Sequence, residues 1–229
     1  MSTTVTEIWK RIGQIADVHV DRHFVIDNKT HSNCLVDLSG LTNPENTGLL
    51  REVAIELFRR TIAEGRFDTN KAVMMVGTAL LDTKLVELMR EINESEPMIE
   101  SLVPAEIREE KLFVGSDLVN SITPETQVIL VQALLQEIKS VNKTIGSVIR
   151  PLGSGVRAIS SIIDQSGLEA DDFGVPFVIA LRSVEVLHFD LSTGTCPLCS
   201  EGRPIVKNRG QGEEHKRHFP KYKGGYIDL

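Results

Sequence analysis

Two hydrophobic periodicities alternate along the chain. Apolar residues recur at helical spacing over residues 3–17 and again over 43–63. The second of these helices would begin at Asn43-Pro44, since asparagine caps a helix and proline suits its first turn. Between the two helices, residues 23–32 place apolar positions on both sides of a short polar run, which predicts a strand, a turn and a second strand.

From residue 71 onward the pattern becomes strand, loop and helix in repetition. Apolar runs predict strands at 72–76, 112–114, 128–131, 156–164 and 176–181. Helical spacing predicts connecting helices at 80–92 and 140–152, whereas the acidic segment 94–110 is predicted to be irregular. Strands that alternate with helices favour right-handed crossovers, so we expect an α/β fold with a mostly parallel, five-stranded sheet.

Composition narrows the functional classes. The chain has 229 residues, of which 41% are hydrophobic, enough for a folded core, and its net charge of −7 argues against general nucleic-acid binding. The basic residues near the C-terminus are expected to be a solvated tail. No apolar run approaches the ~20 residues that cross a bilayer, and no signal peptide is evident. With three cysteines, we expect a reducing cytoplasm and no disulfide framework.

Five segments carry a resemblance to a known family. They are His23-Phe24-Val25-Ile26 with His31-Ser32, Met74-Met75-Val76-Gly77-Thr78-Ala79, Val128–Val131 with Ser140-Val141, Ile162-Ile163-Asp164-Gln165-Ser166-Gly167, and the C-terminal run Cys196-Pro197-Leu198-Cys199 to Lys207. In this order they resemble the motifs of type I phosphoribosyltransferases of the orotate branch, and the C-terminal run is the most specific match. The resemblance spans nearly the whole chain.

This resemblance implies a Rossmann-like architecture with three parts. Residues 1–66 would form an N-terminal helical and hairpin region, 67–190 the phosphoribosyltransferase-like core, and 191–229 a C-terminal extension. Members of the family form dimers, so we expect a homodimer or a subunit of a hetero-oligomer. The ligand crevice would lie at the carboxyl ends of the strands, as in other open α/β sheets.

The segment that should bind phosphoribosyl pyrophosphate (PRPP) departs from the family pattern. Two adjacent acids of the family bind the ribose hydroxyls, but Gln132 and Ala133 stand at these positions. The two threonines and two glycines that wrap the 5-phosphate are replaced by Gln136, Glu137, Ile138 and Lys139. Glycine allows a close approach of phosphate to the backbone, and a β-branched residue does not.

Two further anion contacts of the family are also missing. Asp82 and two leucines follow Ala79 where glycines would face the pyrophosphate, and no lysine-rich mobile loop is evident between residues 94 and 125. Each lost charge-assisted contact would cost on the order of 1.5–3 kcal/mol, which together amounts to several powers of ten in affinity. We therefore expect PRPP-dependent transfer to be absent, as in a pseudoenzyme.

Three functional hypotheses follow from this resemblance. The first is a ligand-sensing or protein-interaction subunit that binds a small nucleotide-like molecule. The second is an orotate-type phosphoribosyltransferase or another glycosyl-transfer enzyme of pyrimidine nucleotide metabolism, which would need Mg²⁺ only if PRPP binds. The third is an accessory or effector subunit of a bacterial conflict system. The residues expected to line the crevice are Thr78, Leu80, Asp82, Gln132, Gln136, Lys139 and Ser140.

A second candidate site lies near the C-terminus. Cys196 and Cys199 form a Cys-x-x-Cys pair, and His215 and His218 follow. Two thiolates and two imidazoles suit tetrahedral Zn²⁺, although the His-x-x-His gap is short for a zinc site. A metal-free C-terminal turn with solvated histidines is the alternative interpretation.

Overall fold

A computed structural model describes the chain except for residues 1–4, 28, 117, 137, 151–152 and 193. The chain forms two compact units. Unit 1 comprises Met1–Ile12 and Ser39–Val184, and unit 2 comprises Gly13–Leu38 and Glu185–Leu229. The division into three parts at residues 66 and 190 stays a prediction.

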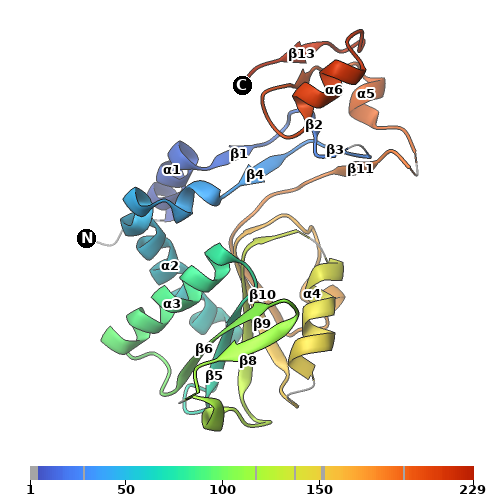
Figure 1. Cartoon of the computed structure of the whole chain (residues 1–229). Coiled ribbons are helices and arrows are strands. Elements are labelled where there is room, and N and C mark those ends of the chain that lie inside the picture. The colour runs from blue at the N-terminus through green and yellow to red at the C-terminus, as the bar shows by residue number, and fades with distance from the viewer. Residues whose placement is uncertain (1–4, 28, 117, 137, 151–152, 193) are drawn as a thin grey trace. The chain divides into compact units, whose positions relative to one another are not determined.

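Unit 1 is built on a six-stranded sheet (Figure 1). Its strands are β5 (Val73–Gly77), β6 (Leu102–Arg108), β7 (Lys111–Val114), β8 (Gln127–Leu135), β9 (Val156–Asp164) and β10 (Phe177–Ser183). Their order is β10-β9-β8-β5-β6-β7, and all neighbours are parallel except β6 and β7. The predicted α/β class is therefore confirmed, with five parallel strands and one added antiparallel edge strand.

The prediction of an irregular segment at 94–110 was wrong, because β6 lies within it. Burial along β6 alternates, with Val103 and Ala105 buried and the acidic and basic side chains directed outward. Two buried residues give only a weak strand pattern, and the acidic residues around them favoured the prediction of a loop. The hairpin from β6 to β7 turns at Glu109 and Glu110, which have φ of 48° and 62°. This left-handed turn returns the chain antiparallel to β6.

Helices cover both faces of the sheet. Helices α2 (Thr47–Gly65) and α3 (Leu80–Ser95) pack on one face, and α4 (Ile138–Thr144) packs on the other and continues as a π-helical turn, Ile145–Ile149 (Figure 1). A 3₁₀ turn at Pro44–Asn46 leads into α2 near the predicted start. Helix α1 (Val5–Ile15) and the helices predicted from 80 and 140 are present, although Leu152 lies outside the described residues. None of the described helices is both long and apolar enough to cross a membrane.

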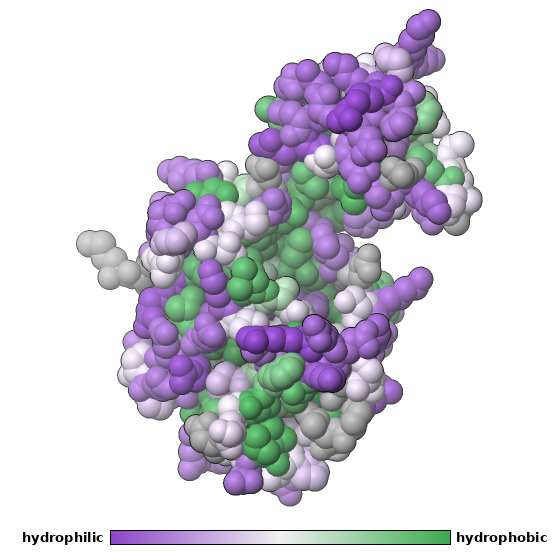
Figure 2. Space-filling model, viewed as in Figure 1, coloured by the Kyte–Doolittle hydropathy of each residue, from purple (hydrophilic) through white to green (hydrophobic). Residues whose placement is uncertain are grey.

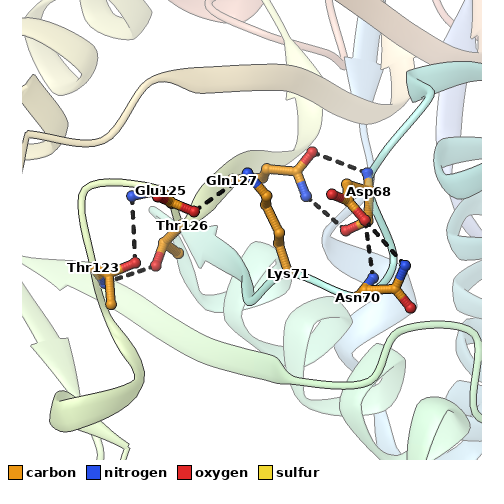
Figure 3. A network of polar contacts seen from close by, with 7 residues as sticks. All are labelled: Asp68, Asn70, Lys71, Thr123, Glu125, Thr126 and Gln127. Atoms are coloured by element: carbon orange, nitrogen blue, oxygen red, sulfur yellow. Dashed lines mark hydrogen bonds and ion pairs between the residues drawn. The ribbon is translucent and has the colours of Figure 1, made fainter.

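Polar side chains at the amino ends of β5 and β8 bind one another (Figure 3). The Gln127 side chain accepts a hydrogen bond from the Asp68 N–H at 3.1 Å and donates one to the Asp68 carbonyl at 2.9 Å. Lys71 and Glu125 form an ion pair at 3.3 Å. These contacts fasten the loops that enter the two central strands. The opposite, carboxyl edge is where ligands bind in open α/β sheets.

Unit 2 consists of short strands and two short helices. Its elements are β1 (Asp17–His19), β2 (Phe24–Val25), β3 (Thr30–Ser32), β4 (Leu35–Asp37), β11 (His188–Asp190), α5 (Pro197–Ser200), β12 (Ile205–Val206), α6 (Gly212–His218) and β13 (Tyr226–Ile227). The predicted hairpin is present, since β2 and β3 pair antiparallel and β11 adds to β3. The C-terminal segment joins the hairpin through a bridge between His23 and Ile205.

Candidate functional site

The predicted crevice of unit 1 is a small polar cavity at the end of β8. It has a volume of about 150 Å³ and is lined by Gln132, Leu134, Gln136 and Ser140. Three of the seven predicted crevice residues thus lie together. The lining side chains offer amides and a hydroxyl, and none of the four carries a charge.

The two positions that are acidic in the resembled family lie inside β8. Gln132 pairs with Ser161 of β9, and the strand pairing continues to Leu135 opposite Asp164. Gln132 and Ala133 are 8% and 4% exposed, respectively. Beyond the strand, the Gln136 amide donates a hydrogen bond to the Gln165 side-chain oxygen at 3.2 Å. Glu137 lies outside the described residues.

Asp82 is turned into the protein, and not toward a ligand. Its Oδ2 accepts hydrogen bonds from the Thr78 hydroxyl at 2.8 Å and from the Ala79 N–H at 3.0 Å, and it lies 3.4 Å from the Thr78 N–H. Its Oδ1 accepts a bond from the Ala133 N–H at 2.7 Å. The carboxylate therefore caps the N-terminus of α3 and ties it to β8.

Burial raises the pKa of the Asp82 carboxyl, and this effect outweighs the four hydrogen bonds, which act in the opposite direction. The donors that a pyrophosphate would need at the start of α3 are already used by this side chain. The turn before α3 is also tight, because a Cβ on Gly77 would lie 2.7 Å from the Thr83 nitrogen. Asp82 is therefore a structural residue of the loop.

The remaining predicted crevice residues differ in their surroundings. Thr78 is used in the bond to Asp82, as described. The Leu80 side chain is 69% exposed at the first turn of α3, and Lys139 is exposed in the first turn of α4. Neither of these two residues is part of the lining of the cavity at Gln132.

The second site lies wholly in unit 2, where four potential metal ligands meet. His23, His31, Cys196 and Cys199 offer one ligand atom each, and these atoms all lie within 4.8 Å of one another. His23 Nε2 is 2.9 Å from His31 Nδ1, 3.7 Å from Cys199 Sγ and 3.8 Å from Cys196 Sγ. The separation between Cys199 Sγ and His31 Nδ1 is 3.3 Å. This His/Cys group could hold a metal ion.

The predicted ligand set shares only its two thiols with this group. His215 and His218 are not among the four converging residues. The His215 ring lies next to that of His31, with 5.5 Å between the ring centroids, and its Nδ1 is 2.9 Å from the Tyr226 hydroxyl. His218 Nε2 is 3.9 Å from a Glu214 oxygen. Both histidines line a cavity of about 570 Å³, which His31 and Cys199 of the His/Cys group also border. The sequence pattern favoured the nearer histidines, whereas the fold brings the hairpin histidines to the Cys-x-x-Cys pair.

Burial sets the charge state of the His/Cys group. It lowers the pKa of His31 to about 4, mainly by desolvation of the imidazolium and further by His23. It raises the pKa of the Cys199 thiol to about 11, with a further contribution from Cys196. Both shifts favour the neutral imidazole of His31 and the neutral thiol of Cys199 near pH 7.

Comparison with known proteins supports the family resemblance. No protein-family model matches the chain. The chain is 26% identical over 190 residues to an orotate phosphoribosyltransferase of Carboxydothermus hydrogenoformans, covering 82% of this chain and 89% of that protein. It is 27% identical over 186 residues to an orotate phosphoribosyltransferase of Caldanaerobacter subterraneus, and the match covers 81% of this chain and 87% of that protein.

The solved structures lead to the same fold. The orotate phosphoribosyltransferase of Francisella tularensis matches with a TM-score of 0.56 at 14% identity, over 78% of this chain and 84% of that one. The predicted resemblance to orotate phosphoribosyltransferases is confirmed by these matches, and the chain has the type I phosphoribosyltransferase fold.

Proposed function

We propose that this chain is a phosphoribosyltransferase-fold protein that has lost PRPP-dependent transfer and acts as a ligand-sensing or protein-interaction subunit. The main support for the proposal is that backbone N–H groups at the positions that bind anions in the resembled family are hydrogen-bonded within this protein. The Asp82 carboxylate occupies the donors at the start of α3 and the Ala133 N–H. Gln132 and Ala133 stand inside β8 where carboxylates would bind a ribose.

The size and chemistry of the cavity support the same proposal. A volume of 150 Å³ is below the roughly 300–1,000 Å³ of typical pockets for drug-sized ligands. Its amide and hydroxyl groups suit a compact, uncharged, hydrogen-bonding molecule or the polar side chain of a partner protein. A sugar diphosphate carries several negative charges, and these groups would replace its hydration poorly.

Magnesium does not fit this site. Mg²⁺ requires near-octahedral oxygen ligands, supplied in such enzymes by one or two carboxylates and substrate phosphates. Among the described residues, the cavity lining has no carboxylate, and both oxygens of Asp82 accept hydrogen bonds. The described lining therefore supports no magnesium-dependent step.

An active orotate phosphoribosyltransferase is the second candidate, and the 26% identity to such a protein favours it. The test is to incubate the purified chain with PRPP, Mg²⁺ and orotate, and to separate orotidine 5-phosphate by chromatography. We expect no product above an enzyme-free blank, with an active orotate phosphoribosyltransferase as the positive control.

Multiple turnovers would contradict the proposal, provided that the activity belongs to this site. A Gln132→Ala variant distinguishes this activity from that of a contaminant, because only the former would change with the substitution.

An accessory role in a bacterial conflict system stays a prediction, as does assembly into a homodimer or hetero-oligomer. We propose a reducing cytoplasm as the compartment, because Cys34, Cys196 and Cys199 form no disulfide.

A further inference from the structure

We propose that His23, His31, Cys196 and Cys199 bind one Zn²⁺ ion as a closed structural site that fastens the N-terminal hairpin to the C-terminal segment. The ligand atoms are His23 Nε2, His31 Nδ1 and the two Sγ atoms. The inference is independent of the proposed function, since it concerns unit 2 alone and holds whether or not unit 1 transfers a phosphoribosyl group.

The distances match the edges of a zinc tetrahedron. With Zn–N near 2.0–2.1 Å and Zn–S near 2.3 Å, the edges of a tetrahedron are roughly 3.3 Å between two nitrogens, ~3.6 Å between nitrogen and sulfur, and ~3.8 Å between two sulfurs. The four separations given above for this group run from 2.9 to 3.8 Å. A single ion can therefore reach all four atoms with small adjustments.

The tautomer of His23 is already set for metal binding. Its Nδ1 lies 3.0 Å from the Arg203 carbonyl oxygen and must donate its hydrogen there, because a carbonyl only accepts. The lone pair is thus on Nε2, which faces the other three atoms. A backbone carbonyl that orients a ligating imidazole in this way is the usual outer shell of a zinc site.

Hydrogen bonds cannot use all the close approaches within this group at once. Three atoms converge on His23 Nε2, namely His31 Nδ1 and the two sulfurs. A neutral imidazole nitrogen has a single lone pair and can accept one good hydrogen bond. A cation between the four atoms would accept one lone pair from each of them and would favour both thiolates.

The ligand types select zinc over other ions. Two sulfurs and two imidazole nitrogens in a tetrahedron are typical of Zn²⁺, whereas Mg²⁺ and Ca²⁺ take oxygen ligands. Four protein ligands leave no open position for a substrate. His23, His31 and Cys196 are each at most 2% exposed and Cys199 is partly buried, so the ligand atoms have little contact with water. A structural role follows from this closure.

Unit 2 has the properties of a fold that needs such a centre. It contains roughly 70 residues, a size at which a hydrophobic core alone rarely suffices. Its strands are two or three residues long, and hydrophilic residues gather over the part that contains α6 (Figure 2). The ligands come from residues 23–31 and 196–199, so one ion would close a loop of more than 160 residues.

Backbone contacts hold the same two segments in register. The Val206 N–H donates to the His23 carbonyl at 2.9 Å, and the Gln211 N–H donates to the Val25 carbonyl at 2.7 Å. A Cβ on Gly210 would lie only 2.5 Å from the Val25 oxygen, so glycine permits this approach. Both ligand pairs are thus positioned by main-chain bonds.

The test is the metal content of the full chain, purified without chelators and measured by mass spectrometry. We expect about one zinc per chain, and a loss of most of it in His31→Asn and in Cys199→Ser. Cys34→Ser and His218→Asn are the matched controls, since each changes the same residue type outside the proposed ligand set, and both should keep the metal. A zinc-free wild-type chain would overturn the proposal, and so would retention of zinc by His31→Asn together with its loss from His218→Asn.

A measurement on the unaltered chain covers the possibility that variants fail to fold. Replacement of zinc by Co²⁺ should give the strong visible absorption of a tetrahedral ion and a thiolate-to-cobalt charge-transfer band. A spectrum of octahedral cobalt without that band would contradict the site and would favour a metal-free hydrogen bond between His31 and His23.

Discussion

The crevice of unit 1 and the His/Cys group of unit 2 use polar residues in opposite ways. In unit 1, the sequence keeps the frame of a ligand-binding motif, but Asp82 has four hydrogen-bond donors within the protein. In unit 2, four potential metal ligands from segments far apart in sequence converge on one point. The hydrogen-bond partners of a polar side chain within the protein, more than its place in a sequence motif, therefore distinguish a structural contact from a ligand site.

The largest predicted effect concerns the metal. Structural zinc in small domains contributes about 10 kcal/mol or more of apparent binding free energy, much of which is folding free energy. Removing zinc with a strong chelator should therefore abolish hydrogen-exchange protection in unit 2, around His23–His31 and Cys196–Gly212, and leave β5 and β8 protected. Equal loss of protection in both units would contradict the prediction that the metal stabilises unit 2 alone.

The next effect concerns the buried carboxylate of unit 1. Asp82→Ala removes the acceptor for the Thr78 hydroxyl, the Ala79 N–H and the Ala133 N–H, and leaves the last of these buried without a partner. We expect a loss of about 3 kcal/mol in the free energy of unfolding, measured in urea. The exposed residue Glu87 in the same helix offers a control, and Glu87→Ala should change stability by less than ~0.5 kcal/mol. Similar values for both variants would show that the cap is unimportant.

A smaller effect is the pH dependence that Asp82 confers. Burial raises the pKa of this carboxyl in the folded state, so the folded protein holds the proton more tightly than the unfolded chain does. The free energy of unfolding should therefore fall as pH rises from about 4, the unfolded pKa, through the folded pKa, and then level off. Urea titrations of the wild type and Asp82→Ala across this range should show their difference shrinking with pH. A difference that grows with pH would mean that folding lowers the pKa of Asp82, and would contradict this prediction.

The smallest effect is expected at the cavity. The Gln136 amide makes one partly exposed hydrogen bond to Gln165 at 3.2 Å. Gln136→Ala should lower the free energy of unfolding by less than ~1 kcal/mol, because water can replace the lost partner. A thermal melt measures this change. A decrease of several kcal/mol would mean that Gln136 is a structural residue like Asp82, and would remove it from the candidate ligand site.

The sequence predicted most of the architecture of unit 1. Strands such as β8 and β9 are buried on both faces and therefore appear as continuous apolar runs. Strand β6 was missed because it lies next to the edge strand, where only Val103 and Ala105 are fully buried, and because it contains Pro104 and lies within an acidic segment. Strands that are buried on both faces could thus be predicted from the sequence, whereas a partly buried strand near the edge could not.

The candidate sites were predicted only in part. The Cys-x-x-Cys pair is local and was found, whereas His23 and His31 reach it only through the pairing of the hairpin with the C-terminal segment. Local spacing favoured His215 and His218, and His215 instead lies against Tyr226. Likewise, the charge of Asp82 was evident in the sequence, but its inward direction depends on the tight turn at Gly77.

The central claim is that unit 1 does not bind PRPP, and calorimetry of the purified chain with PRPP and Mg²⁺ tests it most directly. With Asp82 turned inward and Gln132 and Ala133 in place of acids, we predict no heat of binding up to millimolar PRPP, equivalent to less than about 4 kcal/mol of binding free energy. Saturable binding at micromolar PRPP, about 8 kcal/mol, would contradict the account.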